Sequence, residues 1–435
     1  MSTASSKVAK RSTGYLLGMS VLMLGANVVW TSYNSVLLPT MVQLQPTVAE
    51  NMRGPTVGLI GFFGTLFAIV ASLLAVIITD HSASKWGKRI PGILIGSLLT
   101  LPVIALAAIF FPPVVPLIAV SFILMQTFTN VANGAWWPLL ADIIPEDQRG
   151  TASGVQGILT MVGAALGIVV ISGLVSAGQI QLALWVIGIL MAVSGIITAL
   201  VIRKQDKPEP VAIKRSLWSY VGDMFRVKTR VPVFAWVVAS ATLANMGLNS
   251  LAFFATYFIQ LYFPNQYPTP EAAASGFQLM GGISLVFTMV SAILSGIISD
   301  KVGRRPVILT GVFLCAVTTV AMAFSPSFVF FLIMTAIRSL ATGPILTVIP
   351  ALTSDLSPKE EAGQYMGYAN LATGVSGALS AIIFGVILTS WTRTSFFVIL
   401  IASAFLFLFG ALIFIWKVKQ KTVDQHTTHD VAKAT

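Results

Sequence analysis

Long apolar runs separated by short polar segments form the main pattern of this chain. A helix that crosses a bilayer needs about 20 apolar residues. Twelve runs of this kind lie near residues 14–42, 55–78, 90–111, 114–141, 151–177, 180–202, 233–262, 272–298, 306–325, 327–353, 363–390 and 394–417. Because only helices satisfy their own backbone in hydrocarbon over such short lengths, the pattern predicts an all-α membrane protein with twelve transmembrane helices.

One long polar segment divides the twelve runs into six and six. Residues 203–232 contain eight Lys or Arg residues together with Pro208 and Pro210, a composition typical of a linker. A short surface helix is expected around Trp218–Phe225. The resulting order is a terminus at 1–13, a first bundle at 14–202, the linker at 203–232, a second bundle at 233–417 and a tail at 418–435.

The two groups of six also repeat each other. The same residue types follow the fourth and the tenth run at a constant offset of 213 residues, in the pairs Asp142/Asp355, Pro145/Pro358, Gly150/Gly363 and Gly154/Gly367. Internal repeats of this size are typical of secondary transporters. We therefore expect two pseudo-symmetric six-helix bundles.

Composition and charge support a membrane location. Only 9% of the 435 residues are charged, against about 25% in soluble proteins. With the N-terminus inside, 23 of the 26 Lys and Arg residues fall on the inner side, and only Arg53 and Arg393 fall outside. The positive-inside rule then predicts a multi-pass protein of the cell membrane with both termini cytoplasmic. The basic clusters indicate that the lipid bilayer is a partner, and no nucleic-acid partner is expected.

The chain lacks the motifs of an enzyme. It has no HExxH sequence, no Cys/His cluster and no phosphate-binding Gly-Lys loop. Its single cysteine, Cys315, lies inside an apolar run, where a small buried side chain is the expected role. No catalytic residue, metal or cofactor is predicted.

The loop after the eighth run carries the strongest local signal, Gly296-Ile-Ile-Ser-Asp300-Lys301-Val-Gly303-Arg304-Arg305. An acidic helix end followed by a basic turn is able to form charge-assisted bonds to neighbouring helices. Gly303 permits the sharp turn, and Gly296 permits close approach of another helix. The residues alone leave two interpretations open: an ionic latch, or a solvated loop that only sets the topology.

This loop resembles the cytoplasmic signature of the major facilitator superfamily, and the resemblance covers residues 14–417. The first half has a longer form that runs from Asp80 to Pro91, similar to the loop of the glycoside–pentoside–hexuronide and sucrose-transporter branch. Asn130 through Asp142 is similar to the same branch, whereas His81 and Ile90 depart from it. The resemblance implies the major facilitator fold and ionic latches at Asp80, Gly87, Lys88, Arg89, Asp142, Arg149, Gly296, Asp300, Gly303, Arg304, Arg305 and Asp355.

The resemblance also implies a central cavity lined by the first, fourth, seventh and tenth helices. The sequence makes these four helices polar on one face each. The expected substrate-binding residues are Asn27, Thr31, Asn34, Gln126, Asn130, Asn133, Asn245, Asn249, Arg338 and Thr342. Amides within a bilayer also hold helices together, so this second interpretation stays open for each of them.

Arg338 is the one charge placed at mid-membrane. An isolated Arg there costs at least ~2.5 kcal/mol, so it requires a cavity or a partner. It either binds a substrate carboxylate, phosphate or sugar hydroxyl, or is satisfied by backbone carbonyls. All 15 carboxylates map to loops, tails or helix ends. A coupling proton, a coupling sodium ion and uncoupled transport therefore all stay open.

These observations predict a secondary transporter, a monomer that moves a small-molecule solute by rocking residues 14–202 against 233–417. A sugar or glycoside is the leading solute because of the branch resemblance, with symport as the expected mode. An organic anion or an exported drug is the alternative that Arg338 favours. A non-transporting sensor with the same fold is the alternative from another class.

Overall fold

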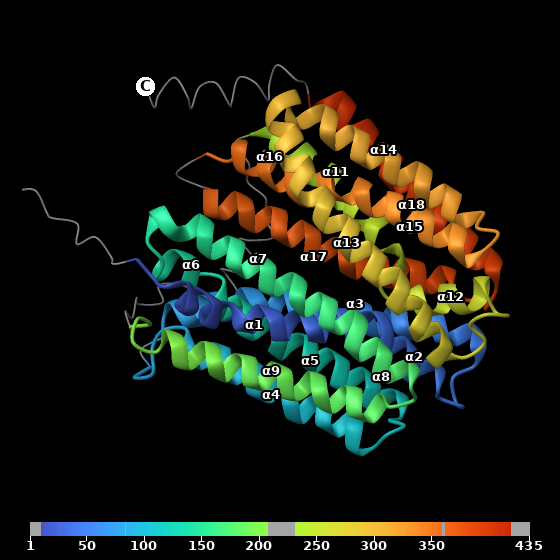
Figure 1. Cartoon of the computed structure of the whole chain (residues 1–435), viewed down its shortest axis with the longest axis horizontal. Helices are drawn as coiled ribbons and strands as arrows, with labels where there is room; N and C mark the ends of the chain where they lie inside the picture. Colours follow the sequence, from blue (N-terminus) through green and yellow to red (C-terminus); the bar gives the residue numbers. More distant parts are fainter. Residues whose placement is uncertain (1–9, 83, 208–230, 359–361, 419–435) are drawn as a thin grey trace, which may run out of the picture. The chain divides into compact units, whose positions relative to one another are not determined.

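The computed structural model describes residues 10–82, 84–207, 231–358 and 362–418 (Figure 1). The expected surface helix around Trp218–Phe225 lies outside these ranges, as do most of the N-terminus and of the tail. Described residues of the spans are helical throughout, apart from short breaks.

The helices of the first half follow the predicted runs closely. They are α1 (Thr13–Ser32), η1 (Tyr33–Leu37), α2 (Leu38–Gln43), α3 (Glu50–Asp80), α4 (Ile90–Ile109), α5 (Val115–Trp136), α6 (Leu139–Asp142), η2 (Glu146–Gln148), α7 (Arg149–Leu166), η3 (Gly167–Ile171), α8 (Ser172–Ser176) and α9 (Ile180–Ile202). The segments α1, η1 and α2 form one span, and so do α7, η3 and α8, because η1 and η3 are single π-helical turns inside longer helices.

The second half contains the remaining spans. They are α11 (Pro232–Leu248), η4 (Asn249–Leu251), α12 (Ala255–Tyr262), α13 (Pro270–Val302), α14 (Arg304–Ala323), α15 (Phe328–Gly343), η5 (Pro344–Val348), α16 (Ile349–Asp355), α17 (Ala362–Ile387) and α18 (Arg393–Lys417). The seventh span is broken, with a bend of 54° between α11–η4 and α12. With this pair counted as one span, the described chain has twelve membrane-spanning helices, which confirms the predicted fold class.

Two compact units make up the chain, and their limits differ from the expected bundles at one place. The first unit comprises 1–45 and 67–221, and the second comprises 46–66 and 222–435. Residues 46–66 join the second unit because the start of α3 packs closely on α17. A Cβ at Gly58 would lie 2.5 Å from the backbone oxygen of Ala381 and 2.8 Å from the Cα of Gly385.

Small residues allow close helix packing inside the first unit, where α4 lies beside α9 (Figure 1) and also contacts α5. A Cβ at Gly96 would lie 2.5 Å from the backbone nitrogen of Ala132 in α5. In the same way, a Cβ at Gly163 of α7 would lie 2.3 Å from the carbonyl oxygen of Leu24 in α1. Such contacts matter in a bilayer because helices there gain little from the hydrophobic effect and associate by tight packing.

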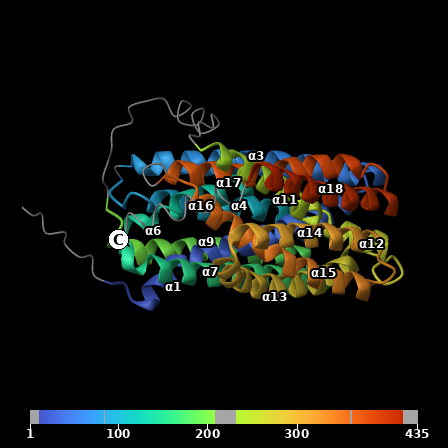
Figure 2. The same ribbon diagram turned by 90° about the horizontal axis from the view of Figure 1, so that it is seen from above.

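Large aromatic side chains fill the second unit. Phe258 contacts the rings of Phe331 and Phe396, with centroids 4.8 and 5.5 Å apart. Phe234 packs edge-on against Tyr365 at 4.6 Å. These rings join α11, α12, α15, α17 and α18, whose course is also visible in Figure 2. The packing of aromatic side chains therefore stabilises the core of this unit.

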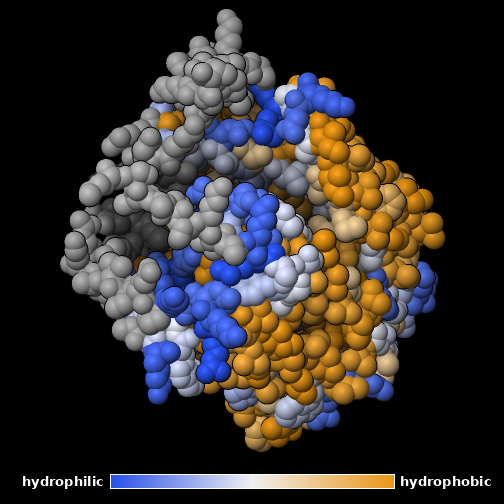
Figure 3. Space-filling model, turned by 60° about the vertical axis from the view of Figure 1, so that its left-hand side comes forward, coloured by the Kyte–Doolittle hydropathy of each residue, from blue (hydrophilic) through white to orange (hydrophobic). Residues whose placement is uncertain are grey.

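Hydrophobic side chains also cover much of the outside, as the broad orange surface in Figure 3 shows. Exposed examples are Leu200 at 64%, Val329 at 66% and Ile293 at 61%. Apolar patches of this extent are costly in water and favourable in lipid. The hydrophilic residues in the same view border this surface, as expected for a protein whose loops lie outside the hydrocarbon.

The packing of α7 on α1 predicts unequal effects of two glycine substitutions in one helix. Gly163→Ala should lower the apparent melting temperature in detergent, since its methyl group would meet the Leu24 backbone. Gly157→Ala is the matched control, because nothing lies within 4 Å of its Cβ position. The control should be neutral or slightly stabilising, by up to ~1 kcal/mol from helix propensity. Equal melting temperatures of the two variants would contradict the packing described.

Candidate functional site

Arg89 forms the centre of a charged cluster in the first unit. Its Nη2 donates to Asp80 and, at 2.9 Å, to Asp142, while its Nε reaches the same Asp142 oxygen at 3.0 Å. Its Nη1 donates to the Thr79 hydroxyl at 2.8 Å. Arg89 is only 1% exposed.

Lys88 adds a second cation to the cluster, 3.3 Å from Asp80. The predicted latch residues Asp80, Lys88, Arg89 and Asp142 thus lie together, at the ends of α3, α4 and α6.

Asp206, a residue that the sequence did not single out, holds this cluster to the segment after α9. Its carboxylate accepts hydrogen bonds from the backbone N–H groups of Arg89 at 2.7 Å and Ile90 at 2.9 Å, the N-cap and the first residue of α4. Burial raises the pKa of Asp206, against the lowering effect of these hydrogen bonds. Gly87 has a positive φ of 122°, and a Cβ there would lie 2.3 Å from the Asp206 carboxylate. Glycine is therefore required at position 87 both by the turn and by the approach of Asp206.

The second unit repeats the same chemistry with fewer bonds. Arg304 Nε donates to Asp355 at 2.7 Å, and its Nη1 lies 3.3 Å from the Ser299 hydroxyl and 3.4 Å from Asp300. Gly303, at φ 90°, ends α13 and allows α14 to start at the next residue. Ser299-Asp300 and Thr79-Asp80 are equivalent pairs, so an alignment of the two halves would have revealed both hydroxyls.

Three of the expected latch residues lie apart from these clusters. Arg149 is 3.8 Å from Glu146 and donates to the Ala141 carbonyl at 3.1 Å, whereas Asp142 is bound by Arg89 and Lys88. Arg305 donates to the Ile415 carbonyl of α18 at 3.1 Å. Gly296 has no atom within 4 Å of its Cβ position, so the close helix approach expected there is not seen.

Arg338 of α15 contacts the end of α11, just before the break of the seventh span. Its Nη2 donates to the carbonyls of Gly247 and Leu248, at 3.3 and 3.2 Å. These are the last two carbonyls of α11, next to the 3₁₀ turn η4. The Nε of Arg338 is buried without a hydrogen bond among the described residues, and no described carboxylate lies within 4.0 Å of it. The end of α11 thus supplies only part of the hydrogen bonding that the guanidinium group requires.

The expected asparagines share one orientation. The side-chain nitrogens of Asn27, Asn130 and Asn245 donate to the carbonyls four residues earlier, at 2.8–2.9 Å. The nitrogen must face that carbonyl because both oxygens are acceptors only. Each amide therefore presents its oxygen to any further partner. These three side chains stay partly accessible although many of their neighbours are buried, as do Thr31, Asn34, Asn249 and Thr342.

Two expected residues of α5 lie deeper. Gln126 and Asn133 are 5% and 3% exposed, and their amide oxygens have no hydrogen-bond donor among the described residues; the Asn34 oxygen in η1 has none either. A buried acceptor without a donor costs about 1–3 kcal/mol. Of the ten expected substrate-binding residues, six lie on helices of the first unit and four on helices of the second unit.

A sequence comparison identifies the family. The profile of the Major Facilitator Superfamily matches residues 15–273 and, overlapping, 251–433. The chain belongs to the Major Facilitator Superfamily. Membership makes it a membrane transporter rather than an enzyme, and it agrees with the fold and with the repeated arginine–aspartate clusters. The narrower resemblance to the glycoside and sucrose branch has no support among the relatives found.

Curated relatives of this superfamily member are fungal transporters. A probable transporter, AQR1 of Saccharomyces cerevisiae, is 26% identical over 132 residues, which are 30% of this chain and 22% of the relative. The MFS-type transporter phiL of a Fungal sp. is 31% identical over 30% of this chain and 31% of its own. A multidrug transporter, AQR1 of Candida glabrata, is 25% identical over 26% and 19%. The matched region thus spans about a fifth to a third of these relatives.

Solved structures of other superfamily members share the fold. The nucleoside transporter NupG (D323A mutant) has a TM-score of 0.72 at 14% identity, covering 92% of this chain and 100% of its own. A bacterial homologue of the human lysosomal transporter Spinster, inward-facing and occupied, has a TM-score of 0.72 at 12% identity, over 94% and 97%. At such identities the likeness concerns the fold alone.

The Arg89 cluster predicts a specific loss of stability. Asp142→Asn removes a charge that accepts two hydrogen bonds from a buried arginine, and Asp80 compensates only in part. We expect a loss on the order of 1–3 kcal/mol, visible as a lower melting temperature in detergent. Asp147→Asn is the control, since its pair with Lys10 is exposed (59% and 74%) and such pairs contribute about 0–1 kcal/mol. The cluster would lose its assigned role if both variants melted alike.

Proposed function

We propose that this superfamily member carries small organic anions that also bear hydrogen-bond donors, and that it does so by alternating access. The observation that carries the proposal is the state of Arg338. The proposal also places the basic loops on the cytoplasmic side, as the positive-inside rule requires. It goes beyond family membership, which leaves the solute open.

Arg338 offers an uncompensated positive charge inside a span. Its charge is balanced by no described carboxylate, and two backbone carbonyls satisfy only its Nη2. A cation at this depth costs at least ~2.5 kcal/mol unless it meets a partner or water. An anionic solute would offset this cost by pairing with the cation. A guanidinium group binds carboxylates and phosphates in a bidentate manner.

The amide oxygens of the first unit add a second requirement. Asn27 and Asn130 present acceptors, so they favour solutes with hydroxyl or N–H groups. The orphaned oxygens of Asn34, Gln126 and Asn133 indicate the same preference, because a donor would relieve their cost. The two units thus offer different chemistry to a solute: acceptors in the first and a cation in the second.

This proposal replaces the sugar or glycoside as leading solute. The sugar hypothesis depended on branch resemblance, whereas the Candida glabrata relative is called a multidrug transporter. A neutral glycoside remains the second candidate, since the acceptor oxygens suit hydroxyl groups equally well. A non-transporting sensor would make the same contacts with its ligand but would show no exchange.

Replacement of Arg338 distinguishes these candidates. In proteoliposomes, Arg338→Gln should reduce counterflow of a substrate anion at least tenfold, while Arg338→Lys, which keeps the charge, should retain part of it. Arg393→Gln is the matched control, because Arg393 also donates to a backbone carbonyl, that of Ser325 at 2.9 Å, at the start of α18. Its counterflow should equal that of the unchanged protein.

Three readouts keep this experiment decisive. A melting curve of each variant shows whether Arg338→Gln acts through the end of α11 rather than on the solute. Undiminished anion counterflow in a folded Arg338→Gln protein would refute the anion proposal and favour a neutral glycoside. Absence of counterflow in the unchanged protein for every tested anion, sugar and drug would favour a sensor. An imposed proton or sodium gradient in the same vesicles tests for a coupling ion.

A further inference from the structure

A groove opens between α4 and α9 in the first unit, at the end where α9 stops and α4 starts. Its volume is about 600 Å³. Ile90 and Leu94 of α4 and Ile196, Ala199 and Leu200 of α9 form its apolar wall. Leu200 is 64% exposed and Ile196 is 40% exposed. The groove therefore opens on a surface that is too apolar for water and suited to lipid.

Three cations form the rim of the same groove. Lys85 comes from the loop before α4, and Arg203 and Lys207 come from the segment after α9. All three are exposed, and no described carboxylate lies within 4.0 Å of any of them, in contrast to Lys88 and Arg89 in the same loop. Trp86, 59% exposed, lies beside them. Exposed tryptophan is enriched at the level of lipid head groups.

The single acidic residue of the lining does not neutralise this rim. Asp206 is 7% exposed, and its carboxylate is bound to the backbone N–H groups of Arg89 and Ile90. The lining thus holds three cations and one carboxylate that is already hydrogen-bonded. The same lining thus attracts a negatively charged group and offers apolar side chains to a hydrocarbon chain.

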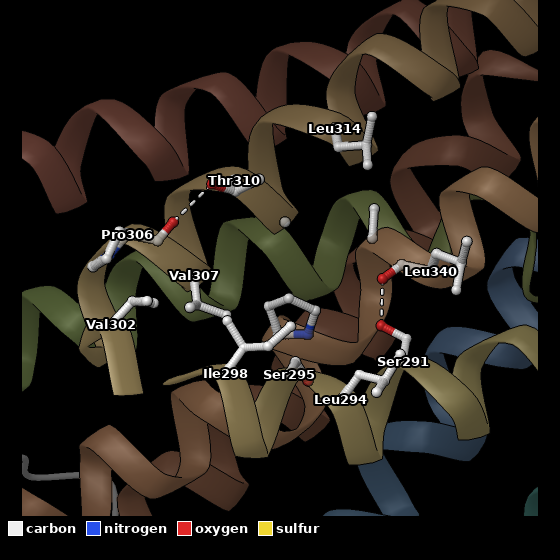
Figure 4. Close-up of a pocket in the computed structure, with 13 residues that line it drawn as sticks. Ser291, Leu294, Ser295, Ile298, Val302, Pro306, Val307, Thr310, Leu314 and Leu340 are labelled. Atoms are coloured by element: carbon white, nitrogen blue, oxygen red, sulfur yellow. Dashed lines mark hydrogen bonds between the residues drawn. The ribbon is translucent and has the colours of Figure 1, made fainter. Parts of the chain in front are cut away.

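A second groove shows that this combination is not general. In the second unit, α13, α14 and α15 border a groove of about 350 Å³ whose lining, drawn in Figure 4, includes Leu294, Ile298 and Leu340. Two of its polar groups are already hydrogen-bonded within the protein: Ser291 of α13 donates to the Leu340 carbonyl of α15, and Thr310 donates to the Pro306 carbonyl of its own helix at 2.9 Å. None of the described residues that line it is charged. It suits an acyl chain without selecting a head group.

We propose that the groove between α4 and α9 is a binding site for an anionic phospholipid. Its phosphate lies among Lys85, Arg203 and Lys207, and an acyl chain follows Leu94, Ile196 and Leu200. Basic pockets between transmembrane helices suit such head groups. Because Asp206 lies between Arg203 and Lys207 and holds the start of α4, the bound lipid also stabilises the Arg89 cluster. The proposal is independent of the transported solute.

Lipid retention by the purified full chain tests this site. The test variant is Lys85→Gln/Arg203→Gln/Lys207→Gln, and the matched control, Lys204→Gln/Lys301→Gln/Lys417→Gln, removes as many exposed cations outside the groove. Native mass spectrometry should show phosphatidylglycerol bound to the unchanged protein and to the control. The test variant should retain it roughly tenfold less, since basic residues near anionic lipid contribute additively. Phosphatidylcholine should bind all three proteins alike.

Melting temperatures provide the second measurement. Phosphatidylglycerol should raise the melting temperature of the unchanged protein and of the control but not of the test variant. Ala199→Phe, which fills the groove and keeps every cation, should lose both retention and stabilisation. Equal loss in both triple variants, or full retention by Ala199→Phe, would overturn the proposal in favour of diffuse surface attraction. Equal stabilisation by inorganic phosphate alone would overturn it in favour of a soluble anion.

Discussion

The cost of an unpaired charge in a low-dielectric environment governs where this protein places its polar groups. Arg89 is almost fully buried, and it is tolerated because two carboxylates and a hydroxyl accept its hydrogen bonds. Loss of these partners would leave a buried cation uncompensated, and such a loss is strongly destabilising. The ends of α3, α4 and α6 are therefore tied to one another by this residue, and through Asp206 to the segment after α9.

The second unit also pairs an arginine with two aspartates, but its loop is shorter. Asp300 and Arg304 are four residues apart, whereas Asp80 and Arg89 are nine apart. The short loop keeps Arg304 near its own helix end, where it reaches Asp355 and leaves Asp300 71% exposed in its side chain. In the longer loop Arg89 turns inward, and the loop requires a glycine with a positive φ at position 87 and an additional acceptor, Asp206. The repeat thus preserves the arginine–aspartate pair and varies its depth.

Arg338 follows the same rule with weaker partners. It meets the carbonyl end of α11, where the helix dipole favours a cation, but not a carboxylate. Arg89 finds all its partners within the protein, two carboxylates and a hydroxyl. Arg338 finds only two backbone carbonyls, and its Nε has no partner among the described residues. This contrast is the physical basis for the proposal that Arg89 stabilises the structure and that Arg338 binds the solute. The basic rim of the α4–α9 groove shows the same contrast at the membrane surface.

Hydropathy by itself determined the number of spans and the fold class, because a bilayer accepts only long apolar helices. The repeat, with Asp142 and Asp355 at equivalent places, and the Asp80 and Asp300 loops were also readable from local sequence. Tertiary structure alone decided which partners these residues have: Asp206 was invisible because its role depends on a contact 117 residues away. The break of the seventh span after Leu251 was equally hidden. So was the packing of 46–66 on α17, since it depends on backbone contacts between segments that are far apart in the sequence.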